Sequence, residues 1–88
     1  MGELCNVLKA LTQKGRTAFI PYITAGDPTL ADTKLFVKTL VDAGADIIEL
    51  GVPFSDPIAD GPTNQKAAER ALASGTTLAG IFSLVREI

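Results

Sequence analysis

The order of two short apolar runs around one amphipathic segment is the feature that most constrains this fold. Residues 18–24 and 46–50 are apolar and too short for helices, so each is predicted to form a strand. Residues 29–43 place apolar side chains at helical spacing, with Thr29 as a candidate N-cap and Gly44 at the expected C-terminal stop. A strand–helix–strand unit of this size implies parallel pairing with a right-handed crossover.

Further helices are predicted on both sides of this unit. Residues 3–13 show helical spacing, residues 62–74 form a helix that starts at a proline, and Thr77 caps a last helix. This order predicts an α/β barrel or a doubly wound sheet. If the fold is the barrel, which has eight strands when closed, residues 1–88 would be one incomplete TIM-barrel domain. It would carry an extra N-terminal helix and two parallel strands, and end after its second β/α unit.

Composition restricts the chemistry more than the fold. The net charge of −2 is spread along the chain, which argues against a nucleic-acid surface. No apolar run approaches the ~20 residues of a membrane span, and no signal peptide is evident, so the cytoplasm is expected. Cys5 has no disulfide partner and is interpreted as a packing residue. With no histidine in the chain, acid–base chemistry must use carboxylates, lysines or Tyr22.

Glu49 is the first candidate for such chemistry. It lies near the C-terminal end of the second predicted strand, within an otherwise apolar run. Both faces of a parallel sheet covered by helices are buried, and a buried carboxylate is unfavourable unless it is paired or protonated. Barrels also place their active sites at this end of their strands. The alternative is that the Glu49 carboxylate is solvated at the end of the strand and accepts a hydrogen bond from a loop amide.

Asp60 is the second candidate and closes an unusually long loop of residues 51–61. Taken alone, it suits an N-cap for the helix that starts near Pro62, and Asp56 suits a turn before Pro57. Taken with Glu49, it completes a carboxylate pair of the kind that performs acid–base catalysis.

Tyr22 is a weaker candidate, either lining the mouth of a barrel or packed in the core with its hydroxyl bonded. No glycine-rich phosphate motif is present, and the spacing of the acids fits no defined metal-binding loop, so no metal site is predicted.

Two contiguous segments resemble a known family. Residues 21–28, Pro-Tyr-Ile-Thr-Ala-Gly-Asp-Pro, are similar to the first strand and turn of tryptophan synthase alpha chains. Residues 43–62 resemble the signature segment of that family almost residue for residue. The similarity extends over essentially the whole chain, with Asn64 departing from an expected aliphatic residue.

This resemblance implies a (β/α)₈-barrel lyase that cleaves indole-3-glycerol phosphate to indole and glyceraldehyde 3-phosphate. It implies no cofactor in this chain, and a beta chain carrying pyridoxal phosphate as partner in an α2β2 tetramer. Glu49 would shuttle protons, Asp60 would hold the indole N–H, and Tyr22 would line the pocket. The residues implied to meet the beta chain are Pro53, Phe54, Ser55, Asp56 and Pro57.

The 88 residues are not expected to act alone, because phosphate sites in such barrels commonly come from the loops after strands 7 and 8. We therefore expect little or no lyase activity from this chain by itself. One alternative is a non-catalytic module that binds a beta chain. Another is a different phosphate-handling barrel enzyme, which would not explain the run from Glu49 to Pro62. A last alternative is a barrel assembled from four copies.

Overall fold

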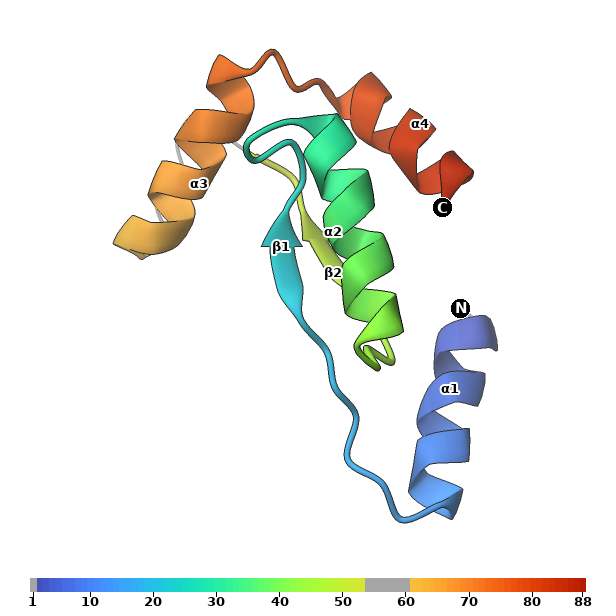
Figure 1. The fold of residues 1–88 in the computed structure, drawn as a ribbon. Coiled ribbons are helices and arrows are strands. Elements are labelled where there is room, and N and C mark those ends of the chain that lie inside the picture. Colours follow the sequence, from blue (N-terminus) through green and yellow to red (C-terminus); the bar gives the residue numbers. More distant parts are fainter. Residues whose placement is uncertain (1, 54–60) are drawn as a thin grey trace.

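The computed structural model describes residues 2–53 and 61–88, in which two strands alternate with helices (Figure 1). The elements are α1 (Gly2–Gln13), β1 (Tyr22–Thr24), α2 (Leu30–Asp42), β2 (Glu49–Gly51), α3 (Pro62–Ala73) and α4 (Leu78–Glu87). The strands pair in parallel, and Tyr22 lies opposite Glu49. The predicted α/β class with two parallel strands is therefore confirmed.

The helices begin and end close to the predicted residues, because the residues that cap a helix lie within a few positions of its ends. Thr29 Oγ1 accepts the Asp32 amide hydrogen at 3.1 Å, and Thr77 Oγ1 accepts the Gly80 amide hydrogen at 3.1 Å. Both are N-caps that satisfy an amide left open at the helix start. Beyond the C-terminal end of α2, Gly44 takes a positive φ of 102°, as a helix-terminating glycine does.

Both strands are shorter than the predicted 18–24 and 46–50. Pro21 has no amide hydrogen to donate to a sheet. The Phe19 amide donates to the Asp46 carboxylate at 2.8 Å, and the Asp46 and Ile47 amides both donate to the Phe19 carbonyl. The two segments are thus joined before the strands begin, but by a side chain and a shared carbonyl rather than by a regular ladder.

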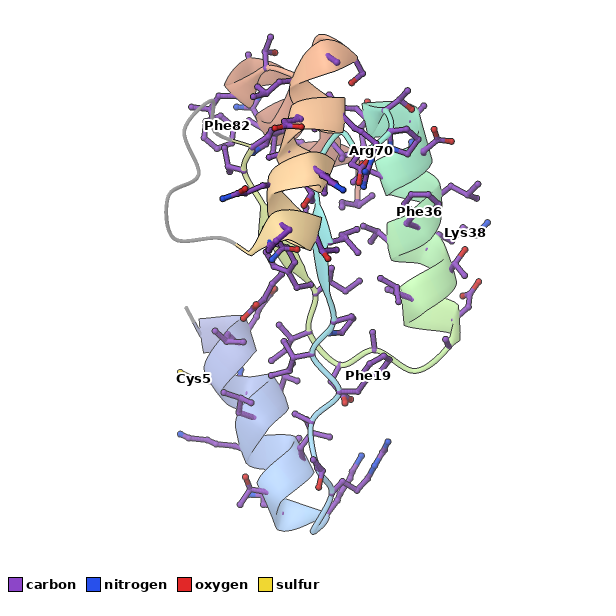
Figure 2. All side chains as sticks on the ribbon, turned by 90° about the vertical axis from the view of Figure 1, so that its left-hand side faces the viewer. Cys5, Phe19, Phe36, Lys38, Arg70 and Phe82 are labelled. Atoms are coloured by element: carbon purple, nitrogen blue, oxygen red, sulfur yellow. The ribbon has the colours of Figure 1, made fainter. Side chains whose placement is uncertain are left out.

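The core consists mainly of small side chains around the turn that follows β1. The helix α3 packs on β1 and α4 packs on α2. The buried residues are Leu11, Thr24, Ala25, Thr33, Val37, Ala67, Ala68, Ala71, Ile81 and Leu84. Many large apolar side chains, including Phe19, Phe36 and Phe82 (Figure 2), are exposed.

The helix α1 lies apart from the other helices, connected to β1 by an extended segment (Figure 1). Cys5 is consequently exposed on this helix, so its interpretation as a packing residue is wrong for this structure. In the part of the chain that is described, no helix has both the length and the apolarity to cross a bilayer.

Candidate active site

The parallel register brings together two of the residues singled out in the sequence. Tyr22 and Glu49 are direct neighbours on β1 and β2, and the Glu49 amide donates to the Pro21 carbonyl at 3.0 Å. Paired residues of a parallel ladder place their side chains on the same face of the sheet. A carboxylate beside a phenol can exchange a proton with a ligand and bind its polar groups.

Glu49 is exposed, so the burial predicted for it is not found. The described residues form a sheet of two strands. That prediction assumed a strand with a neighbour on each side and helices over both faces. Two strands do not enclose a side chain in this way.

Gly51 allows the Tyr22 ring to approach the backbone of β2. A methyl group built at Gly51 would overlap the hydroxyl and ring atoms of Tyr22. The backbone of Gly51 has no positive φ, so glycine is needed here for space rather than for conformation. This contact was not predicted from the sequence, although a glycine within a strand is a known signal of close approach.

The turn that follows β1 is held by side chains from α2 and from the end of α3. The Gly26 amide donates to Thr33 Oγ1 at 2.9 Å, and Ser74 Oγ donates to the Gly26 carbonyl at 3.2 Å. Gly26 has a φ of +90°, and a methyl group built on it would overlap Thr76. The sequence identified this turn but not the side chains that hold it.

An ion pair joins this turn to α3. Arg70 Nε lies 2.7 Å from Asp27 Oδ1, and Arg70 Nη2 lies 2.9 Å from Asp27 Oδ2. The hydrogen bond with Asp27 raises the pKa of the Arg70 guanidinium above its ordinary value. Figure 2 labels Arg70, which projects from α3. The pair is bidentate, the arrangement in which arginine and carboxylate bind most specifically.

An open cavity of about 250 Å³ lies between β1, α2 and α3, and its lining includes Tyr22, Thr24, Asp27, Asn64 and Arg70. It therefore connects a predicted site residue with the ion pair. Within residues 2–53 and 61–88, no group of three or more His, Cys, Asp or Glu side chains could hold a metal ion.

Most of the predicted loop lies outside the described residues: Phe54, Ser55, Asp56, Pro57 and Asp60. Their proposed roles stay predictions, and Pro53 is half-buried just after β2. The N-cap position of α3 is held by Gly61, without a side-chain cap. The alternative role of Asp60 as an N-cap concerns a residue outside the described ones, so it stays a prediction.

Comparisons with known proteins agree on one family. Residues 8–88 match the family model described as tryptophan synthase alpha chain. The chain is 60% identical over 87 residues to the alpha chain of Marinobacter nauticus, and 58% identical over 87 residues to that of Dechloromonas aromatica. Both matches cover 99% of this chain but 32% of the relative. The chain thus spans about a third of the length of these curated relatives.

Solved structures show the same relationship. The tryptophan synthase alpha subunit of Legionella pneumophila superposes with a TM-score of 0.94 at 42% identity, covering 97% of this chain and 32% of that one. A chain of the Pyrococcus furiosus tryptophan synthase α2β2 complex superposes with a TM-score of 0.75 at 51% identity, covering 80% and 30%. The structural neighbours are TIM barrels, which confirms the predicted fold class.

Proposed function

Because this chain belongs to the tryptophan synthase alpha chain family, we propose that it supplies the first two β/α units of a barrel lyase. The reaction is the retro-aldol cleavage of indole-3-glycerol phosphate to indole and glyceraldehyde 3-phosphate. The observation that supports this most directly is the parallel register that pairs Tyr22 with Glu49. Both residues begin their three-residue strands, two positions before the C-terminal edge at which barrels build their sites.

Glu49 has the chemistry that the cleavage requires. Breaking the carbon–carbon bond needs a proton delivered to a ring carbon and a proton removed from a hydroxyl group. One carboxyl group can do both in turn. In this proposal Asp60 binds the indole N–H and stabilises the developing positive charge, and Tyr22 forms part of the pocket wall.

The proposal includes a partner but no cofactor within this chain. Pyridoxal phosphate would belong to a beta chain that joins the released indole to serine in the cytoplasm. The contact would use Pro53, Phe54, Ser55, Asp56 and Pro57. Its support is that a structural neighbour comes from an α2β2 complex.

A chimera tests the lyase assignment. Residues 1–88 replace the equivalent segment of the Marinobacter nauticus alpha chain, which is 60% identical over 87 residues, and indole release from indole-3-glycerol phosphate is measured. Glu49→Gln should lower kcat at least ~100-fold, the scale of a lost general acid–base group. Asp42→Asn, which alters an exposed carboxylate at the end of α2, should leave kcat unchanged. A chimera that releases no indole, or a fully active Glu49→Gln variant, would contradict the proposal.

The second candidate is a non-catalytic chain that binds a beta chain. Its support is again that a structural neighbour comes from an α2β2 complex. Here the 88-residue chain alone should release no more indole than its Glu49→Gln variant. It should still bind a purified beta chain in a titration, and more tightly than a variant in which residues 53–60 are scrambled. Equal binding by the two chains would exclude this candidate.

A further inference from the structure

The turn between β1 and α2 is contacted by α2, by α3 and by the residues just after α3. Its backbone at Gly26 is bonded by Thr33 of α2 and by Ser74 just after α3, and Thr76 packs against it. Asp27 is bound from α3 by Arg70. Elements far apart in the sequence therefore meet at one turn, immediately beyond the C-terminal end of β1.

The Asp27–Arg70 pair is built differently from an ordinary surface ion pair. Its two N–O contacts are 2.7 and 2.9 Å long, and the Asp27 side chain is only 18% exposed, while the Arg70 side chain is 55% exposed. The pair between Lys34 and Glu87 has a single contact of 3.1 Å, and both of its side chains are more than half exposed. Exposed pairs of the second kind contribute little, whereas a bidentate pair also fixes the orientation of its two partners.

Arg70 shares a helix face with the wall of the cavity beside Tyr22. Thr63, Ala67 and Arg70 are spaced by four and three residues on α3, so they lie on one side of the helix. All three line the cavity, together with Tyr22 and Thr24. Because Arg70 lies in the last turn of α3, holding it fixes that end of the helix, and with it the cavity-lining face, relative to the Tyr22 side of the site.

We propose that Arg70 is a positioning residue. Through its bidentate pair with Asp27, it sets the placement of α3 against β1 and so shapes the pocket wall opposite Tyr22. In this proposal Arg70 acts through the placement of α3 and not through contact with the substrate. Its kinetic consequence rests on the proposed lyase function, but its structural consequence does not.

The test compares variants of the chimera described above. Arg70→Met and Asp27→Asn should each lower kcat/KM about tenfold, because small displacements of a site wall reduce the rate strongly. The double variant should be no worse than either single one, since both remove the same pair. Arg70→Lys should recover only part of the loss, because lysine cannot bind both carboxylate oxygens in parallel.

Two controls separate positioning from loss of stability and from loss of charge. Lys34→Met breaks the exposed pair and Ile81→Val removes a methyl group from the core of α4; neither should change kcat/KM. Direct binding of the anionic substrate by Arg70 predicts the opposite pattern. In that case Arg70→Lys restores KM, and Asp27→Asn leaves kcat/KM unchanged or raises it.

Hydrogen exchange measured by mass spectrometry supplies a readout that does not need turnover. Amides of residues 25–27 and 67–73 should exchange several-fold faster in Arg70→Met than in the parent chimera, and not in Lys34→Met. Unchanged exchange overturns the proposal, as does faster exchange with unchanged kcat/KM in an active chimera. If the parent chimera releases no indole, the lyase proposal fails, and the exchange result alone decides whether the pair positions α3.

Discussion

Replacing Gly26 by alanine should destabilise the fold through two separable effects. The first is conformational, because Gly26 has a φ of +90° and a left-handed backbone is unfavourable for alanine by about 1–2 kcal/mol. The second is steric, because the new methyl group would overlap Thr76. Forcing extra volume into a packed site costs about 1–3 kcal/mol. The expected loss is the sum of the two, about 2–5 kcal/mol.

Gly75 provides a matched control for the conformational effect. Its φ of +87° is nearly the same as that of Gly26, but a methyl group there would meet nothing within 4 Å. Gly75→Ala should therefore lose only about 1–2 kcal/mol. The difference between the two variants measures the close approach of Thr76 to the turn.

The assay is urea unfolding of the chimera followed by circular dichroism, with free energies taken by linear extrapolation. Gly26→Ala should unfold at a clearly lower urea concentration than Gly75→Ala. Adding Thr76→Ala to Gly26→Ala should recover part of the difference, because it removes two of the three atoms that would be overlapped. Equal losses at the two glycines would refute the reasoning.

Two further predictions address the site and α1. Gly51→Ala should displace the Tyr22 ring and lower kcat/KM of the chimera by about tenfold. The matched variant Gly61→Ala, where a methyl group meets open space, should lower kcat/KM less. Equal losses in the two variants would argue against a role for the Tyr22 contact. Cys5 is exposed, so in the folded chain it should react with a thiol reagent as fast as a free cysteine in a short peptide. A slow reaction that becomes faster in denaturant would contradict this exposure.

Local features of this fold could be predicted from the sequence, whereas its long-range contacts could not. Thr29 and Thr77 cap their helices through amides three residues away, so the signal for each cap is contained in a few neighbouring letters. The extent of the strands was overestimated, because apolarity does not reveal that Asp46 binds the Phe19 amide across 27 positions. Asp46 falls inside the predicted strand 46–50, and nothing in its sequence position indicates that its side chain binds a distant amide.

At the candidate site, too, the features of single residues could be predicted and the long-range contacts could not. Glu49 and Tyr22 stand out by residue type and position, and the parallel pairing that aligns them follows from the strand–helix–strand order. The burial expected for Glu49 depended on strands that the described residues do not contain. The role of Arg70 could not be predicted from its neighbours in the sequence, because one arginine on a helix gives no indication that its partner is Asp27.

The separation of Asp27 and Arg70 by 43 positions also has a consequence for synthesis on the ribosome. A polypeptide grows at about 5–20 residues per second, so Arg70 leaves the exit tunnel roughly 2–9 seconds after Asp27 does. During that interval α2 and β2 can already bind the end of β1, through Thr33 and through the parallel pairing, while the contact with Arg70 of α3 is still missing. For seconds the nascent chain therefore has an Asp27 carboxylate without its arginine partner, at a stage when chaperones have access to it.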